Sequence, residues 1–515
     1  MIEPEENRRS RRTFIKSVLA GTAGTLMAGI DQQAAHANND AQQKRADVSQ
    51  PSLSEASQLV RSKKVSPVEL THECLSRIER LNPKLNAFIT VTADSALTEA
   101  RQAEAEIQRN RWRGPLHGIP IALKDLIDTA GVRTTAASGL FKDRVPAQDA
   151  EIVRRLKAAG AVLLGKLNLH EFAYGGSSVI SYFDAVHNPW NLDYSPGGSS
   201  GGSGAAVAAQ LCYGAIGSDT GGSVRQPAGY CGIVGLKPTY GRVSTSGVIP
   251  LSWSLDHLGP MTRTVTDAAF MLQVIAGYDA QDTASIDVRV PNYAATIADA
   301  TSSLRLGIPR AYFYEALHPE IQAAMEAALS VLKKLTRTQR DIAPLAANDT
   351  YASMMDPYVT ILRAEAYAYH KEYVSKSPDL YQPQTLKRIQ TGADITASAY
   401  IQARHQLEQI RRSVARVFET VDLLITPTTC VPPFAIADLL DPTTLRDKEL
   451  LMLRNTRPLN MLGLPTVSVP CGFTRTDLPI GMQITGPPGG EATVLRLGYA
   501  YEQATEWRKR KPNLD

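Results

Sequence analysis

The sequence predicts an α/β fold, in which helices alternate with the strands of a largely buried sheet. Residues 119–123 and 161–164 are short, continuous apolar runs, and the segment between them has a helical pattern that ends at Gly160. A strand, a helix and a strand at this spacing are typical of α/β proteins. Further apolar runs of strand length lie at residues 304–308, 423–426, 466–470 and 480–484.

Helices are expected before and between the first strands. Ser66, Pro67 and Glu69 form a capping box with proline at the first helical position, which predicts an amphipathic helix to about Leu81. A second helix is expected over residues 93–109. Asp149 is expected to cap the helix that separates the first two strands.

The segment between Pro319 and Glu419 has apolar residues mainly at helical spacing. We expect a helical cap over about residues 310–420, in a position to influence substrate selectivity. The chain contains no internal repeat and no low-complexity tract.

The composition indicates a soluble globular protein with a sizeable core, because 43% of residues are hydrophobic and 21% are charged. The 55 basic and 51 acidic residues are spread along the chain, which gives no support to nucleic-acid binding. The five cysteines are widely spaced without a C-x-x-C pair, which excludes a disulfide framework and a cysteine-rich zinc site. We expect them to be reduced core residues.

The N-terminus resembles a twin-arginine signal peptide over residues 1–37. Arg11 and Arg12 precede an apolar stretch over residues 17–30, and Ala37 ends a small-x-small cleavage site. The apolar stretch is shorter than the ~20 residues that a membrane span requires. We therefore expect export, cleavage near Ala37, no stable membrane insertion and a periplasmic or secreted enzyme. Residues 38–51 are polar and are expected to form a flexible linker.

Glycine and serine fill residues 197–204. A phosphate-binding loop would require a G-K-[ST] ending, which is missing, and a linker is disfavoured because an apolar helix over residues 205–209 follows directly. Residues 197–201 also fit the G-x-S-x-G nucleophile elbow of α/β-hydrolases, with Ser199 as the nucleophile. That esterase alternative requires a preceding strand, whereas residues 187–196 contain two prolines.

A second glycine-rich turn lies within residues 217–227 and ends at Ser223. Such a turn can direct several backbone N–H groups at one oxyanion, and a serine that follows it is well placed as a nucleophile. A serine needs a base. None of the nine histidines has a recurring spacing with an acidic partner. A lysine that burial keeps neutral is the other possible base.

These segments resemble the amidase signature family. The similar residues are 114–125, the two glycine-serine stretches, 231–239, 426–428 and 463–465. The resemblance covers about residues 52–508. It implies a single amidase-signature domain over residues 52–510, in which helices cover both faces of a central mixed β-sheet and a helical cap is added.

The resemblance also implies the catalytic residues. By position in the family motifs, Ser223 is the nucleophile, Ser199 is a bridging serine that follows a cis peptide bond, and Lys124 is the base. Burial would lower the pKa of Lys124 from ~10.4 toward ~7 to 8, so that it can deprotonate Ser199. Ser199 would in turn take the proton of Ser223. The expected oxyanion hole consists of the backbone N–H groups of Thr220, Gly221, Gly222 and Ser223.

Other polar residues in these motifs have supporting roles by the same resemblance. Ser200 and the pair of Asp219 with Arg225 are expected to support the loops, although an ordinary loop cap and a surface ion pair are equally open. Lys166 and Lys237 lie in family-like segments outside the catalytic position and are expected to be structural.

The implied activity is hydrolysis of a linear amide, in a peptide amide, an aryl acylamide or a carbamate, without a cofactor or metal. The partner is a small-molecule or peptide amide substrate, and a homodimer is possible. The alternative is the glutamine-hydrolysing subunit of a tRNA amidotransferase, which needs partner chains in the cytoplasm. The export signal argues against it. Asn455 and Thr456 do too, because that branch carries a substrate-recognising acidic residue near this position.

Overall fold

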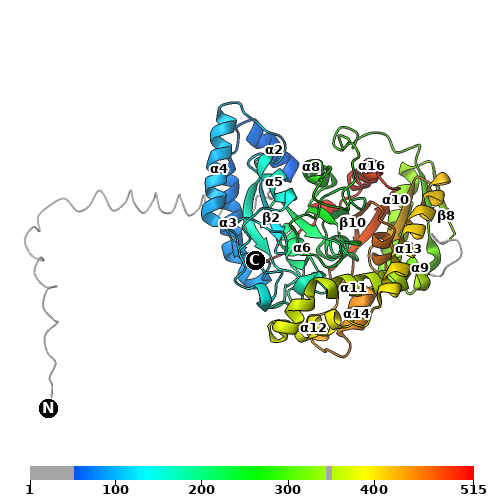
Figure 1. The fold of residues 1–515 in the computed structure, drawn as a ribbon. Helices are drawn as coiled ribbons and strands as arrows, with labels where there is room; N and C mark the ends of the chain where they lie inside the picture. Colours follow the sequence, from blue (N-terminus) through cyan, green and yellow to red (C-terminus); the bar gives the residue numbers. More distant parts are fainter. Residues whose placement is uncertain (1–50, 344–350, 515) are drawn as a thin grey trace, which may run out of the picture. The chain divides into compact units, whose positions relative to one another are not determined.

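One mixed β-sheet of eleven strands organises the residues that the computed structural model describes, 51–343 and 351–514 (Figure 1). The predicted signal peptide, and all of the predicted linker except Pro51, lie outside these residues. The strand order is β1-β3-β2-β4-β6-β5-β10-β11-β9-β7-β8. The strands are β1 (Phe88–Val91), β2 (Pro120–Lys124), β3 (Val162–Leu167), β4 (Gly214–Ser218), β5 (Val234–Lys237), β6 (Leu258–Thr262), β7 (Arg305–Ile308), β8 (Thr338–Asp341), β9 (Leu423–Pro427), β10 (Thr466–Phe473) and β11 (Pro479–Thr485).

Helices flank this sheet. The α-helices are α2 (Leu53–Arg61), α3 (Pro67–Leu85), α4 (Ala93–Gln108), α5 (Glu151–Ala158), α6 (Gly201–Ala208), α7 (Arg225–Cys231), α8 (Val265–Ile275), α9 (Arg310–Phe313), α10 (Pro319–Leu335), α11 (Tyr351–Lys376), α12 (Pro383–Gln390), α13 (Ala397–Ser413), α14 (Leu445–Met452), α15 (Arg457–Met461) and α16 (Glu491–Gln503). Helix α3 packs against β2 and β3, α4 packs against β3, and α6 packs against β2, β3, β4 and β6. This arrangement confirms the predicted α/β fold.

The burial of strands β2, β3 and β4 explains why part of the sheet could be predicted from the sequence. β2 pairs in parallel with both β3 and β4, and every residue of these three strands is buried. Strands that are buried on both faces have continuous apolar sequences instead of alternating ones. The strands expected from such runs, at β2, β3, β7, β9, β10 and β11, are confirmed.

Five strands, β1, β4, β5, β6 and β8, were not predicted. The sequences of β4 and β6 contain glycine, serine or proline within the strand, and these residues have low β-propensity. Gly259 in β6 shows why glycine is used there. A Cβ at this position would lie 2.0 Å from the carbonyl oxygen of Leu236 in β5, so the close approach of the two strands requires glycine.

Asp149 does not cap a helix, contrary to the prediction. Helix α5 begins at Glu151, and its N-cap residue, Ala150, has no side-chain cap. The Asp149 carboxylate instead accepts a hydrogen bond from the Ala130 N–H at 2.8 Å and pairs with Lys157 at 2.7 Å. The residue therefore fastens a loop to α5 from outside the helix.

The predicted helical cap, residues 310–420, extends too far toward the N-terminus. Helix α10 packs against β10 and β11, and β8 extends the sheet by pairing in parallel with β7. The later helices α11, α12 and α13 pack on one another and form the helical region beyond the sheet. The apolar spacing could not distinguish a helix that covers a sheet from one that belongs to a cap.

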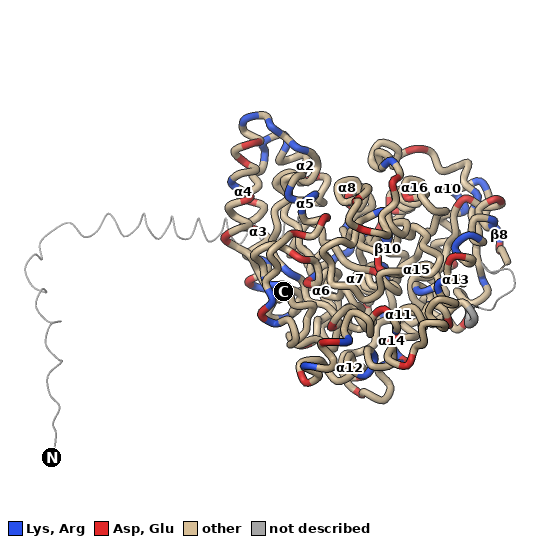
Figure 2. Tube along the Cα trace, viewed as in Figure 1, with Lys and Arg blue, Asp and Glu red and all other residues tan. Residues whose placement is uncertain are grey.

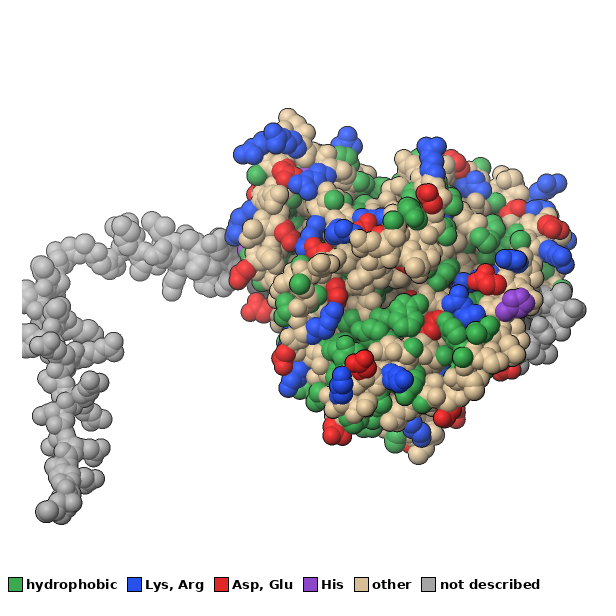
Figure 3. All heavy atoms as spheres, viewed as in Figure 1, with side chains coloured by type: hydrophobic (Ala, Val, Ile, Leu, Met, Phe, Trp, Pro, Cys, Tyr) green, Lys and Arg blue, Asp and Glu red, His purple; other side chains and the backbone are tan. Residues whose placement is uncertain are grey.

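The distribution of charged residues and the state of the cysteines match what the sequence predicted. Basic and acidic residues are interspersed along the described chain (Figure 2), and charged and hydrophobic side chains mix on the visible face (Figure 3). All five cysteines are free and buried, which confirms their prediction as core residues. Among the described residues, no helix is long and apolar enough to cross a membrane.

Candidate active site

Of the three predicted catalytic residues, one lies at the end of a strand and two lie in loops. Lys124 ends β2, and Ser218 ends the adjacent parallel strand β4. The turn after β4 leads to Ser223 and then to α7, while Ser199 lies in the loop that precedes α6. Parallel strands bring their carboxyl ends to the same edge of a sheet, where open α/β sheets bind their ligands. The two glycine-serine stretches therefore meet above β2 and β4.

Lys124 contacts two serines. Its Nζ donates to Ser199 Oγ at 2.7 Å and to Ser218 Oγ at 2.8 Å, and the lysine side chain is completely buried. The expected proximity of Lys124 and Ser199 is thus present. The contact of Ser218 with Lys124 was not predicted from the sequence. It depends on the pairing of β4 with β2, and β4 was not predicted as a strand.

Burial gives Lys124 an unusual protonation equilibrium. Loss of solvation lowers the pKa of its ammonium group to about 7, although the carboxylates of Asp219 and Asp256 favour the charged form. At neutral pH a substantial fraction of Lys124 is therefore a free amine. A free amine hydrogen-bonded to Ser199 is able to accept a proton from it.

The backbone holds Ser199 in place. The Gly198–Ser199 peptide bond is cis, as expected from the family resemblance. The carbonyl oxygen of Ser199 accepts hydrogen bonds from the His170 N–H at 3.1 Å and from Ser178 Oγ at 3.3 Å. A Cβ on Gly198 would lie 2.7 Å from Ser178 Oγ, so this loop has no room for a side chain before Ser199.

The nucleophile-elbow alternative for Ser199 lacks its structural context. Residues 195–200 are irregular, and no described strand leads into the serine. The side-chain partner of Ser199 is Lys124, not a histidine. The esterase alternative therefore loses both the strand and the base that it requires.

Ser223 lies beside Ser199 and is 4% exposed. Its carbonyl oxygen accepts a hydrogen bond from the Ser200 N–H at 3.3 Å, which ties the two loops together. Its hydroxyl makes no hydrogen bond within the described residues. The structure therefore contains the first link of the expected relay, from Lys124 to Ser199, but not a direct hydrogen bond from Ser199 to Ser223.

The turn before Ser223 is ordered by Asp219. Its carboxylate accepts hydrogen bonds from the Gly222 N–H at 2.8 Å and from the Val224 N–H at 3.1 Å. The expected set of oxyanion donors is corrected here, because the Gly222 N–H is already used. The N–H groups of Thr220, Gly221 and Ser223 have no hydrogen-bond acceptor within the described residues and remain candidates.

Asp219 and Arg225 form a completely buried ion pair, which excludes the simpler interpretation as a surface pair. Arg225 Nε and Nη2 each lie 3.0 Å from a carboxylate oxygen of Asp219. Burial disfavours the charged carboxylate, but the charge and hydrogen bonds of Arg225 outweigh it and lower the pKa of Asp219. Arg225 also donates to Asn460 Oδ1 at 2.6 Å and to Gln483 Oε1 at 2.7 Å, which anchors the turn in the core.

Ser200 connects the same two loops. Its hydroxyl donates to the Ser218 carbonyl oxygen at 3.2 Å, and it occupies the N-cap position of α6 without a side-chain cap. Ser200 therefore does not cap α6, and its contact with the Ser218 carbonyl oxygen is compatible with an ordinary loop cap. Ser200 supports the geometry between Ser199 and Ser223.

The segment that follows α14 packs on the nucleophile turn. Thr456 Oγ1 donates to the Gly221 carbonyl oxygen at 2.6 Å, and a Cβ on Gly222 would lie 3.1 Å from Leu453 Cδ2. The Asn455 amide points elsewhere and donates to the Phe313 carbonyl oxygen at 2.9 Å. Residues 453–456 thus present an apolar and a hydroxyl group to the site, with no carboxylate.

The other buried lysines have structural contacts. Lys166 Nζ donates to the Ile127 carbonyl oxygen at 2.6 Å and to Thr134 Oγ1 at 2.7 Å. Lys237 Nζ donates to the Leu464 carbonyl oxygen at 2.6 Å. Neither contacts a serine hydroxyl, in agreement with the structural role expected for both.

The adjacent residues His170 and Glu171 do not form a unit. Glu171 accepts a hydrogen bond from Ser138 Oγ at 2.6 Å, whereas His170 faces Glu449 at 3.4 Å. Burial lowers the pKa of His170 to about 3, so its ring is neutral. The described residues contain no cluster of acidic, histidine and cysteine side chains that could hold a metal ion.

Comparisons with known proteins agree with this geometry. The amidase family model matches residues 69–495. A glutamyl-tRNA(Gln) amidotransferase subunit from Geotalea daltonii is 43% identical over 480 residues, which cover 88% of this chain and 97% of that protein. Among solved structures, a substrate complex of 6-aminohexanoate cyclic dimer hydrolase has a TM-score of 0.82 and 32% identity, covering 90% of this chain and 98% of that one. Peptide amidase from Stenotrophomonas maltophilia has a TM-score of 0.79 and 30% identity, covering 91% of this chain and 99% of that one. The chain therefore belongs to the amidase signature family and is a hydrolase that acts on amides.

Proposed function

We propose that this amidase works without partner chains and cleaves a linear amide in a peptide amide, an aryl acylamide or a carbamate. The observation that carries the chemistry is the 2.7 Å hydrogen bond between the buried Lys124 amine and Ser199 Oγ. A base of this kind removes the need for histidine. The substrate class rests on the family resemblance and on residues 453–456, which present no carboxylate to the turn before Ser223.

In the proposed reaction, neutral Lys124 accepts the hydroxyl proton of Ser199 while Ser199 takes the proton of Ser223. Ser223 Oγ forms a bond to the substrate carbonyl carbon, and the carbonyl oxygen becomes an oxyanion. The proton returns through Ser199 to the departing amine as the C–N bond breaks. Water then attacks the acyl-enzyme by the same proton route and releases the acid.

The N–H groups of Thr220, Gly221 and Ser223 are the proposed oxyanion donors. Loss of one such donor costs about 3 to 4 kcal/mol in comparable sites, so their fixed orientation matters for the rate. The contacts of Asp219 with the Gly222 and Val224 N–H groups hold the turn in shape. Asp219 and Arg225 are proposed to position the turn without touching the substrate.

A second candidate function is glutamine hydrolysis within a tRNA amidotransferase. The 43% identity to the amidotransferase chain from Geotalea daltonii favours it, and by overall identity the comparisons support it better than they support the first candidate. Leu453 and Thr456, which pack on the turn before Ser223, argue for the first candidate, because neither side chain offers a carboxylate to an amino-acid ammonium group. Both candidates use the same catalytic residues.

A substrate panel separates the two candidates. The purified chain alone is incubated with p-nitroacetanilide, a peptide amide, an aryl carbamate and L-glutamine, and the release of p-nitroaniline, ammonia or phenol is measured. The first candidate predicts cleavage of at least one of the first three substrates at a higher kcat/KM than that of glutamine. Hydrolysis of glutamine alone would assign the chain to the second candidate.

We also propose that the enzyme is exported through the twin-arginine pathway and acts in the periplasm or outside the cell. Arg11, Arg12 and the apolar stretch that follows support this proposal. An exported enzyme would be separated from cytoplasmic tRNA and its charging machinery. Export and the first candidate function therefore support each other.

A further inference from the structure

A surface cavity of about 550 Å³ lies between α11, α12 and α14, which are neighbours in Figure 1. Its wall carries four cationic side chains from these three helices. They are Arg363 from α11, Lys387 and Arg388 from α12, and Arg446 from α14. Positive charge from three separate helices therefore converges on one cavity.

Acidic side chains balance only part of this charge. Glu449, which is completely buried, lies 2.7 Å from Arg388 and 3.9 Å from Arg446. Arg363 and Lys387 are exposed and form no ion pair within the described residues. The cavity thus retains cationic groups that are available to an anionic ligand.

The rest of the wall is largely apolar. The Tyr174 ring, Leu445 and two prolines line the cavity, and the Arg446 guanidinium lies 6.0 Å from the centre of the Tyr174 ring. An apolar surface edged by guanidinium groups suits a ligand with a hydrocarbon or aromatic body and an anionic end. A simple inorganic anion would leave the apolar part of the wall unused.

Helix α14 runs from the cavity toward the turn that carries the nucleophile. Leu445 and Arg446 at the start of α14 line the cavity, and Leu453 directly after the helix packs beside Gly222, the neighbour of Ser223. Eight residues of α-helix span about 12 Å. We propose that this cavity binds an anionic end of the substrate, such as a carboxylate, at about this distance from the scissile carbonyl. This inference rests on the proposed amidase function and adds a substrate class to it.

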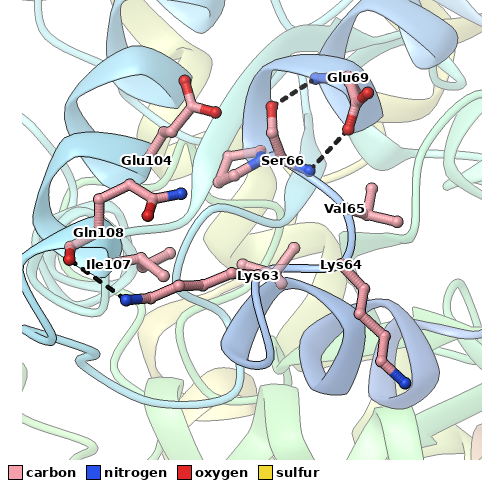
Figure 4. Close-up of a pocket in the computed structure, with 10 residues that line it drawn as sticks. Lys63, Lys64, Val65, Ser66, Glu69, Glu104, Ile107 and Gln108 are labelled. Atoms are coloured by element: carbon pink, nitrogen blue, oxygen red, sulfur yellow. Dashed lines mark hydrogen bonds between the residues drawn. The ribbon is translucent and has the colours of Figure 1, made fainter.

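A second, smaller cavity offers no comparable site (Figure 4). Lys63 there donates to the Gln108 carbonyl oxygen at 3.2 Å, and Ser66 and Glu69 close the capping box of α3. Two lysines, Lys63 and Lys64, and two carboxylates, Glu69 and Glu104, line it, so its charges balance. The cationic cavity differs because four cationic side chains and no acidic one line it.

The test uses matched substrates that differ only in the distal group. The p-nitroanilides of adipic, suberic and sebacic acid are compared with the same anilides whose free carboxylate is replaced by a neutral N,N-dimethylamide. We expect the full chain to prefer a carboxylate substrate by about tenfold in kcat/KM, mainly through KM, because the carboxylate gains charge-assisted hydrogen bonds to Arg363 and Lys387. High salt should reduce the preference.

Two variants assign the preference to the cavity. The double variant Arg363→Gln/Lys387→Gln should lose the preference and retain its kcat/KM for the dimethylamides. Arg475→Gln, which changes a 95% exposed cation outside the cavity, should behave like the unmodified chain. Equal kcat/KM for both members of every pair, or a preference that survives the double variant, would overturn the subsite while leaving the amidase proposal intact.

Binding separates failure of the subsite from failure of the proposed function. If the chain cleaves none of the anilides, binding of the suberic acid anilide to Ser223→Ala is measured by calorimetry. Binding that disappears when Arg363→Gln and Lys387→Gln are added would support the subsite even though the proposed reaction had failed. Binding that is absent or independent of these substitutions would overturn the subsite.

Discussion

At the scale of single residues, the proposed chemistry depends on Lys124 being uncharged. Its side chain is completely buried, donates to two serine hydroxyls and has a pKa lowered by desolvation to about 7. An exposed lysine would remain protonated at neutral pH and could not act as a base. The sheet core is therefore part of the proposed catalytic apparatus.

The pH dependence of kcat/KM tests this view of Lys124. Because the neutral amine is the active form, activity should rise as the pH rises through about 7 and then reach a plateau. Lys124→Met should lower kcat/KM by about 100- to 10,000-fold. Lys166→Met is the matched control, since Lys166 is equally buried but contacts no serine, and it should keep the rising limb. A rising limb that persists in Lys124→Met would contradict the assignment.

Ser218 gives a second test at this scale. Its hydroxyl accepts a hydrogen bond from Lys124 at 2.8 Å, and such a bond favours the charged ammonium form. Ser218→Ala should therefore lower the pKa of Lys124 and move the rising limb of the pH profile down by about one pH unit. An unchanged or upward-shifted limb in stopped-flow or steady-state profiles would show that Ser218 does not tune the lysine.

The proposed catalytic residues could be chosen from the sequence because each occupies a distinctive motif. Ser223 ends a glycine-rich turn, Ser199 lies in the other glycine-serine stretch, and Lys124 ends an apolar strand. The role of Ser218 and the use of the Gly222 N–H by Asp219 could not be predicted. Both depend on how the end of β4 and the turn after it fold against β2, which a linear motif does not specify.

At the scale of elements, the connection from β4 to α7 is held by a buried ion pair. Asp219 accepts hydrogen bonds from the turn, and Arg225 joins the carboxylate to side chains of α15 and β11. A buried pair of this kind need not add net stability, but removal of one partner leaves a buried charge without compensation. The pair fixes the turn that carries Ser223.

Arg225→Met should therefore destabilise the chain by about 3 to 5 kcal/mol, because Asp219 remains buried and charged. Chemical denaturation, followed by circular dichroism, measures the change in the free energy of unfolding. The double variant Asp219→Asn/Arg225→Met should regain part of the stability but not the activity, since the turn loses its fixed carboxylate. Wild-type stability in Arg225→Met would contradict a structural role for the pair.

Elements were predictable where their own sequence had a strong pattern. The capping box of Ser66 and Glu69 is present at α3, and the apolar runs of β10 and β11 form strands. β8 has the sequence Thr-Gln-Arg-Asp and is mostly exposed at the edge of the sheet, so it has no apolar run by which to recognise it. Its pairing with β7 comes from tertiary structure and not from local preference.

At the scale of the whole molecule, the α/β class and the family could be predicted, but the boundary of the helical cap could not. Apolar spacing marks α10 and α11 as helices in the same way, although α10 covers the sheet and α11 packs on other helices. The cationic cavity also arises only when α11, α12 and α14 come together. Residues from three distant segments do not form a motif in the chain.

Export is tested with residues 1–37 fused to a fluorescent reporter. The proposal predicts that the reporter reaches the periplasm and that the Arg11→Lys/Arg12→Lys variant stays in the cytoplasm, because the paired arginines are read by the export machinery. Cell fractionation measures the distribution. A fusion that remains in the cytoplasm with both arginines present would contradict export. The chain would then not be separated from cytoplasmic tRNA, which would favour the amidotransferase candidate.

Covalent labelling of the full chain tests the proposed catalytic apparatus most directly. The chain is treated with a fluorophosphonate, the adduct is located by peptide mass spectrometry, and amidase activity is measured on the same samples. The proposed apparatus predicts one adduct on Ser223 that abolishes activity, no adduct in Ser223→Ala, and much slower labelling in Lys124→Met. An adduct on Ser199, or full amidase activity in Ser223→Ala, would contradict it.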